Sequence, residues 1–169
     1  YLKLRDFERA MECQTKALEI RKTVFGEKHA DTATSYTNLG ILYMNMRDYE
    51  KSLEYHFKAL NILTMVYHGE NHSDIANAYN NIGLLYQKTE EYGKSLEFLL
   101  KAVELYKSIH GEQHSDTAAS YSEIGSAYHN LEDHEKALEY HLKALEILVA
   151  IYSEDHSEVA AVCINLGCV

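Results

Sequence analysis

Histidines are the residues of this chain whose spacing comes nearest to a recognisable chemistry. The sequence holds 10 of them, and the pairs His68/His72 and His110/His114 have the four-residue separation with which a helix can bind zinc. In both pairs glycine and then glutamate follow the first histidine, whereas zinc proteases place glutamate directly after it. We therefore interpret the recurring second histidine as a loop residue that forms a local hydrogen bond or packs on the next helix. We expect no metal and no cofactor.

Other catalytic arrangements are equally hard to find in the sequence. It shows no Ser-His-Asp order typical of a hydrolase and no glycine-rich loop for a phosphate. His56 and His141 stand beside Tyr55 and Tyr140, where they could titrate near neutral pH, although we favour partly buried, hydrogen-bonded imidazoles. The sequence therefore predicts a protein that is not an enzyme and has no catalytic residues.

An internal repeat predicts the elements that hold these residues. Glycines recur at intervals of 43, 42 and 42 residues, and the first three lie in the phrase Tyr-x2-Leu/Ile-Gly-x2-Tyr: Gly40, Gly83, Gly125 and Gly167. A second phrase places an aromatic residue or histidine three positions before alanine or serine, and a third phrase is Gly/Ser-Glu-x-His. All three phrases recur in step, which indicates a stack of similar units.

Each unit is predicted to be a pair of helices. Tyr36, Leu39 and Tyr43 are three and four residues apart, which is the spacing of one helical face. The first helix of a unit is expected at residues 30–45, 73–88, 115–130 and from 157 onward, and the second helix at 49–66 and equivalent positions. Oxygen-bearing side chains are expected to cap the first helices at Asp31, Ser73, Ser115 and Ser157. Glycines are expected to end the second helices at Gly26, Gly69 and Gly111.

A glycine inside each first helix needs a compensating contact, because it costs about 1 kcal/mol relative to alanine. The simplest explanation is the close approach of a neighbouring helix, for which a β-carbon would be too large. The second helices carry small residues that would serve the same contact: Ala10, Ser52, Ser95, Ala137, Ala17, Ala59, Ala102 and Ala144.

The combined pattern, with a small residue 12 positions after the glycine and alanine 19 after it, resembles the tetratricopeptide repeat. The resemblance implies an all-α fold, an α-solenoid of antiparallel helix pairs wound into a right-handed superhelix. The 42-residue unit and its Gly-Glu-x-His loop are similar to the subclass found in kinesin light chains and nephrocystin-like proteins. The usual tryptophan is tyrosine here, or Cys163 in the last unit, which we expect to be a small hydrophobic core residue, and the usual proline is missing.

The phase of the repeat predicts one array over residues 1–169 that belongs to a longer protein. It would contain an unpaired second helix at 1–28, repeats at 29–71, 72–113 and 114–155, and an unpaired first helix at 156–169. Both ends would then expose faces that a neighbouring repeat covers. Head-to-tail self-association of such segments is an alternative role, as is support of an adjoining effector domain.

In this family the first helices line a concave groove, and the residues predicted to face it are mostly polar and uncharged. The resemblance implies that Asn38, Asn81 and Asn165 hold the main chain of a bound peptide, whereas Glu123 breaks the series. A clamp for a carboxyl terminus would need several basic residues, and only Lys88 is present. The predicted groove residues are Thr34, Thr37, Asn38, Ile41, Asn45, Asn77, Asn80, Asn81, Leu84, Lys88, Ser122, Glu123, His129, Asn130 and Asn165. The alternative is that these amides only solvate a surface that faces water.

Charge and composition limit the classes of partner that the chain can bind. The net charge of −10 argues against nucleic acid and an anionic membrane, and no apolar run approaches the roughly 18–20 residues of a membrane span. Residues 117–158 carry 2 basic and 9 acidic groups, a net −7, which would draw a basic segment unless it serves solubility alone. With 3 cysteines and no signal peptide, the sequence predicts a cytoplasmic scaffold that binds a protein or peptide segment.

Overall fold

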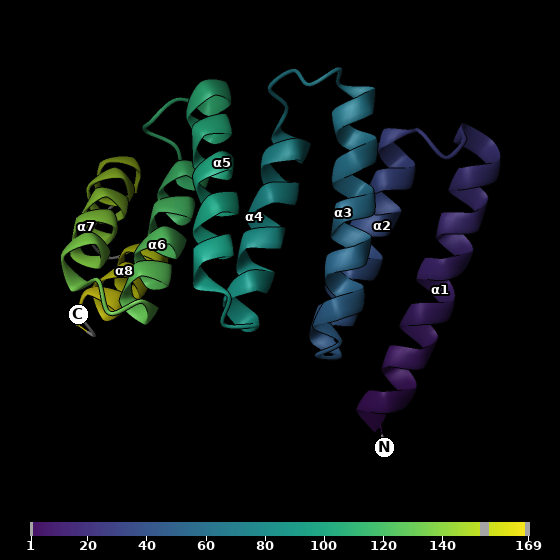
Figure 1. Ribbon diagram of the computed structural model, residues 1–169, viewed down its shortest axis with the longest axis horizontal. Coiled ribbons are helices and arrows are strands. Elements are labelled where there is room, and N and C mark those ends of the chain that lie inside the picture. The colour runs from purple at the N-terminus through teal and green to yellow at the C-terminus, as the bar shows by residue number, and fades with distance from the viewer. Residues whose placement is uncertain (1, 153–155, 168–169) are drawn as a thin grey trace. The chain divides into compact units, whose positions relative to one another are not determined.

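The structure is a computed structural model that describes residues 2–152 and 156–167, with side chains from residue 7 onward. Within these ranges every regular element is an α-helix, and short loops join consecutive helices (Figure 1). The helices are α1 (Leu2–Phe25), α2 (Ala30–Asn45), α3 (Tyr49–Val66), α4 (Ser73–Lys88), α5 (Tyr92–His110), α6 (Ser115–Asn130), α7 (His134–Ile151) and α8 (Ser157–Gly167). The predicted spans of the first helices α2, α4 and α6 and of the second helix α3 agree with these bounds.

The helices belong to two compact units, each of which packs helix against helix. Residues 1–70 contain α1, α2 and α3, and residues 71–169 contain α4 to α8. Within each unit, every helix contacts the next one along the chain, and α4 also contacts α6. In the second unit one apolar cluster joins α5, α6, α7 and α8 through fully buried residues such as Leu99, Ile124, Leu148 and Val159.

The helix-interior glycines are sites of close helix approach, as the sequence predicts. A β-carbon on Gly40 would lie 2.7 Å from Nε2 of His56 on α3, and one on Gly83 would lie 2.7 Å from Cγ of Leu99 on α5. A β-carbon on Gly125 would lie 2.8 Å from the ring of His141 on α7. Real β-carbons essentially never sit so close, so a larger residue at any of these positions would force the facing side chain or helix to shift.

Aromatic rings pack beside this contact in each pair. The Tyr55 ring lies between Tyr36 and Tyr43, with centroid distances of 6.0 and 5.2 Å. Phe98 lies in the same way between two tyrosines of α4, and Tyr140 between two tyrosines of α6. The predicted small residues Ala59, Ala102 and Ala144 are fully buried beneath. One packing scheme therefore recurs in all three pairs.

His56 and His141 correct the sequence prediction, because they are neither partly buried nor fully hydrogen-bonded. Each is only 1% exposed, and its Nδ1 has no hydrogen-bond partner in the described part of the chain. Burial lowers the pKa of His56 from its ordinary value of 6.5 to about 4. Burial also lowers the pKa of His141, and the nearby His129 adds to that effect. Both rings are held neutral because burial disfavours the charged form of an imidazole.

Histidine, rather than aspartate or serine, caps the first helices. The Nδ1 atoms of His29, His72 and His114 accept hydrogen bonds from the backbone N–H two residues later, at 3.1 to 3.2 Å. His156 makes the same contact to the N–H of Glu158 at 3.3 Å. The prediction that this histidine forms a local hydrogen bond is confirmed. The prediction of caps at Asp31, Ser73, Ser115 and Ser157 is wrong, because the accepting side chain stands one or two residues earlier.

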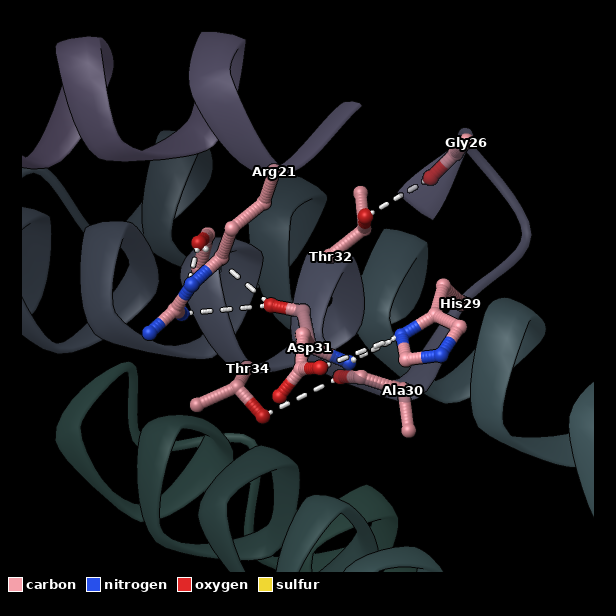
Figure 2. A network of polar contacts seen from close by, with 8 residues as sticks. Arg21, Gly26, His29, Ala30, Asp31, Thr32 and Thr34 are labelled. Atoms are coloured by element: carbon pink, nitrogen blue, oxygen red, sulfur yellow. Dashed lines mark hydrogen bonds and ion pairs between the residues drawn. The ribbon is translucent and has the colours of Figure 1, made fainter. Parts of the chain in front are cut away.

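The loop before α2 shows how the neighbouring groups complete this cap (Figure 2). Gly26 has a left-handed φ of 89°, and its carbonyl accepts a 2.8 Å hydrogen bond from Oγ1 of Thr32. Nη1 of Arg21 on α1 donates to the carbonyl of Asp31 at 3.2 Å and to Oγ of Ser35 at 2.9 Å. Gly111, with a positive φ of 88°, likewise follows α5 directly, so the predicted glycine ends are confirmed for α1 and α5. The prediction is wrong for α3, which ends at Val66, because His68 rather than Gly69 adopts the first positive φ, 53°, after that helix.

The cysteine of the last repeat does not lie in the core. Cys163 is exposed, so it is not the core residue that its position predicts, and Cys168 lies outside the described residues. Cys163 is exposed because no described helix packs on the face of α8 that carries it. On the same face, one turn later, a β-carbon on Gly167 would meet no atom within 4 Å. In the part of the chain that the structure describes, no helix combines the length and apolarity needed to cross a bilayer.

Candidate functional site

The predicted groove residues lie on the first helices, and in the second unit these helices interlock through them. Nδ2 of Asn165 on α8 donates to Oγ of Ser122 on α6 at 3.3 Å. Oγ of Ser120 on α6 donates to Oδ1 of Asn80 on α4 at 3.4 Å. We call this surface the polar wall. Its predicted members are Asn77, Asn80, Asn81, Leu84 and Lys88 of α4, Ser122, Glu123, His129 and Asn130 of α6, and Asn165 of α8.

Several amides of the polar wall are already engaged within the protein. Oδ1 of Asn77 accepts from the hydroxyl of Tyr106 on α5, and Nδ2 of Asn130 donates to the carbonyl of Ser126 at 2.8 Å. Together with the contacts of Asn80 and Asn165, these bonds show that part of the amide row holds adjacent helices together. Sequence reasoning missed this role, because the partners stand 29 to 43 residues away in the chain, except for Ser126 one helical turn away.

Asn81 and Glu123 are two wall residues whose polar side chains have no hydrogen-bond partner among the described residues. Neither the Asn81 amide nor the Glu123 carboxylate is hydrogen-bonded to another described residue, and both side chains are half-buried. Nε2 of Gln87 donates to the backbone carbonyl of Glu123 at 2.8 Å and fixes that point of α6 beside α4. Burial raises the pKa of the Glu123 carboxyl, and the positive charge of the exposed Lys88 opposes that shift.

His129 occupies the end of the wall nearest the α6–α7 turn. Its ring centroid lies 5.5 Å from that of His134, and its buried Nδ1 has no hydrogen-bond partner in the described part of the chain. Although His134 and His141 are near, no three His, Cys, Asp or Glu side chains among the described residues are arranged as metal ligands. The observed contact at this end of the wall is therefore the packing of the His129 and His134 rings.

In the first unit, predicted groove residues line a cavity of about 250 Å³. Asn38, Ile41 and Asn45 of α2 form one side, and Ala10 and Gln14 of α1 form the other. Sequence reasoning missed Gln14, although its position is equivalent to that of His56, Leu99 and His141 in the other second helices. Thr37 is half-buried nearby, and Thr34 is exposed with its hydroxyl donating to the Ala30 carbonyl at 3.1 Å. The cavity lining combines amide groups with an apolar surface.

Comparison with known proteins places the chain among helical repeats. A family model described as a tetratricopeptide repeat matches residues 1–65, 36–108, 74–148 and 116–169. A comparison with curated proteins gives no match.

Solved structures share the fold over nearly the whole chain. BtubC (BKLC) from P. vanneervenii is 24% identical with a TM-score of 0.87, and the match covers 98% of this chain and 66% of that one. A putative kinesin light chain from Podosopora anserina, with nearly identical TPR-like repeats, is 17% identical with a TM-score of 0.79 and coverages of 98% and 78%. The apo form of RapI is 22% identical with a TM-score of 0.79 and coverages of 98% and 44%. This chain thus spans just under two thirds of BtubC and less than half of RapI.

Proposed function

Because the chain belongs to the tetratricopeptide repeat family and has its α-solenoid fold, we propose that it is a non-catalytic binding module. It would bind a peptide or protein segment along its first helices. Repeats of this family generally mediate protein–protein interaction. The single observation that carries the proposal is the unengaged, half-buried amide of Asn81 on the polar wall.

Amide chemistry supports this assignment. A side-chain amide offers two donors and an acceptor, which matches the alternating N–H and C=O groups of an extended backbone. Asn38 stands at the equivalent position of the first unit, where it lines a cavity of about 250 Å³ beside the apolar Ile41. Each site would therefore combine one backbone-binding amide with adjacent apolar surface, a common composition for peptide recognition.

The internal bonds of the wall narrow the set of contact residues. Asn77, Asn80 and Asn165 already hold neighbouring helices, so a ligand that used them would have to replace bonds within the protein. We therefore assign the main contacts to Asn38, Asn81 and the surface around them.

The free thiols of Cys13 and Cys163 support a cytoplasmic location, where thiols remain reduced.

The test uses short random linear peptides displayed on phage and selected on the wild-type protein. Selected peptides are labelled, and their affinities are measured by fluorescence anisotropy for wild type, Asn38→Ala, Asn81→Ala and the double variant. Loss of one or two hydrogen bonds to the ligand should weaken binding about five- to tenfold for a single change. The thermal midpoint should stay within about a degree, because Asn81 has no hydrogen-bond partner in the described part of the chain.

Asn61→Ala is the matched control, because Asn61 is an exposed asparagine on the second helix α3. It should leave peptide affinity unchanged. Failure to select any peptide, or equal affinities for wild type and the double variant, would reject the groove as the binding surface.

A second candidate function, head-to-tail self-association, has its own observation. The first helix α8 exposes Ile164 by 68%, and no second helix packs on it at Gly167 among the described residues. The second helix α1 exposes Ile20 by 63% and Val24 by 64%, whereas the equivalent residues of α3 are buried at Ile62 and half-buried at Val66. Docking of α8 from one copy on α1 of another would cover both apolar faces.

Light scattering over a concentration series tests this alternative. The apparent mass should rise with concentration for wild type, and Ile164→Asp should abolish the rise by burying a charge in the contact. A constant monomeric mass for wild type would reject self-association while leaving peptide binding open to its own test.

A further inference from the structure

One position of the polar wall differs in charge from its equivalents. Two residues before the helix glycine, the four first helices carry Asn38, Asn81, Glu123 and Asn165. Glu123 therefore puts a carboxylate where the other repeats have a neutral amide. It belongs to α6, whose neighbours in the second unit include both α4 and α8.

The turn of α6 that carries Glu123 is hydrogen-bonded to two neighbouring helices. On one side, Gln87 of α4 donates to its carbonyl at 2.8 Å. On the other side, Asn165 of α8 donates to the hydroxyl of the preceding Ser122 at 3.3 Å. These two contacts hold this turn of α6 between α4 and α8, so the Glu123 side chain starts from a fixed point on the wall.

The carboxylate itself lacks a compensating partner. It is half-buried, it accepts no hydrogen bond from a described residue, and no described cation lies within 4.0 Å of it as an ion pair. The charge of Lys88 acts on it, but the Lys88 residue is exposed at the end of α4 and forms no ion pair with it. A half-buried carboxylate in this state is stabilised by any cation that docks against it.

We propose that Glu123 selects a bound segment that carries a lysine or arginine, whose cationic head docks on the carboxylate while Asn81 holds the main chain. This inference rests on the proposed function and names the chemistry of its partner. The charge of the surrounding chain acts in the same direction, because residues 117–158 have a net charge of −7 from 2 basic and 9 acidic groups. Such a field would draw a basic segment toward this end of the wall and favour its association.

The experiment compares peptide selection on wild type with selection on Glu123→Asn. Asparagine is the residue that the other three repeats carry at this position, so the variant should fold, which circular dichroism would verify. Wild type should enrich phage-displayed random peptides that share a lysine or arginine at one fixed position. Glu123→Asn should enrich peptides in which that position is no longer basic.

A double-mutant cycle then measures the contact. For a selected peptide, Glu123→Asn should weaken binding about tenfold, as should replacement of the basic residue by glutamine. The two changes together should cost little more than either alone, because they remove the same contact. In the reverse variant, Asn81→Glu, the selected peptides should carry a lysine or arginine at the position that contacts α4, one repeat earlier than α6.

The outcomes separate this inference from the function on which it rests. Peptides that bind wild type without a basic preference, or an unchanged preference in Glu123→Asn, would overturn the role of Glu123 and leave groove binding intact. Additive effects in the double-mutant cycle would overturn it as well. If no peptide is enriched on wild type, both the partner chemistry and groove binding are wrong.

Discussion

The helix pairs α2–α3 and α4–α5 share one backbone contact but line it with opposite chemistry. In both pairs a glycine of the first helix admits the second helix so closely that a β-carbon would lie 2.7 Å from its neighbour. The neighbour is the His56 imidazole in α2–α3 and the apolar Leu99 in α4–α5. The close approach is therefore set by glycine, and the residue opposite it is free to vary between an imidazole and an alkyl side chain.

The variation extends to the surrounding residues. Tyr55 precedes His56, whereas Phe98 precedes Leu99, so one pair carries two polar side chains at these positions where the other carries none. Oγ of Ser52 donates to the carbonyl of Gly40 at 2.7 Å, while the equivalent Ser95 has no partner in the described part of the chain. The pair α6–α7 again has histidine, at His141. The helix pairs are therefore alike in backbone packing, and they differ in whether a buried imidazole that protons can charge lies at the contact.

Acidification should produce the largest difference between the two pairs. Burial lowers the pKa of His56 from 6.5 to about 4, so the folded protein binds this proton less readily than the unfolded chain does. The contribution of neutral His56 to the free energy of unfolding is fully present above pH 6.5 and is lost as the pH falls toward 4. Over that range His56 should remove roughly 3 kcal/mol from the free energy of unfolding. Urea unfolding followed by circular dichroism at neutral and acidic pH measures this loss.

His56→Leu isolates the effect, because it installs the residue that α4–α5 already uses. The variant should retain its stability at neutral pH and lose about 3 kcal/mol less than wild type on acidification. Leu99→His should make α4–α5 sensitive to acid in the same way. If wild type and His56→Leu lost the same free energy of unfolding on acidification, the buried His56 imidazole would not be the source of the acid sensitivity.

Much of the shared shape could be predicted from the sequence, while the chemistry at the contact could not. The glycine phrase and its period locate the helices and require a close approach at Gly40 and Gly83, because both follow from local spacing and helix propensity. Complete burial of His56 depends on how tightly α3 packs on α2, which no local pattern contains. The same limit explains Cys163, whose core position in the repeat is exposed.

Alanine at a contact glycine should have the next largest effect. Gly83→Ala would place its β-carbon 2.7 Å from Cγ and 3.3 Å from the backbone nitrogen of Leu99, so α4 and α5 must separate. Overpacking of this kind costs about 1–3 kcal/mol, offset by up to about 1 kcal/mol from helix propensity. We expect a net loss of about 1–2 kcal/mol in urea unfolding, with a similar loss for Gly40→Ala against the His56 ring.

Gly93→Ala provides the matched control, because a β-carbon there would meet no atom within 4 Å. The same chemical change on α5 should therefore stabilise the protein by up to about 1 kcal/mol. If Gly83→Ala and Gly93→Ala had the same sign, close approach would not explain the helix-interior glycines.

The sequence predicted which helices carry the amide side chains, but it did not predict which of these amides form hydrogen bonds within the protein. The repeat predicted that these amides lie on the first helices, and the asparagines do lie on α2 in the first unit and on α4, α6 and α8 in the second. It could not separate Asn77, which accepts from Tyr106, from Asn81, which has no such partner among the described residues. That difference arises from side chains on other helices, so an identical residue type holds the fold in one case and stays available in the other.

The smallest effect concerns a contact that the helix pairs have in common. His29 and His114 cap α2 and α6 by accepting the N–H of Asp31 and Asp116 through Nδ1, at 3.2 Å in both cases. Replacement of either histidine by alanine should cost about 1 kcal/mol in urea unfolding, because one N–H at the helix start loses its acceptor. Asparagine should recover most of that loss, since its side-chain oxygen can accept the same hydrogen bond. Stacking of the His29 ring on Phe25 at 4.8 Å would be lost in both variants, so a His29→Asn protein as unstable as the His29→Ala protein would assign the stabilisation to the ring rather than to the cap.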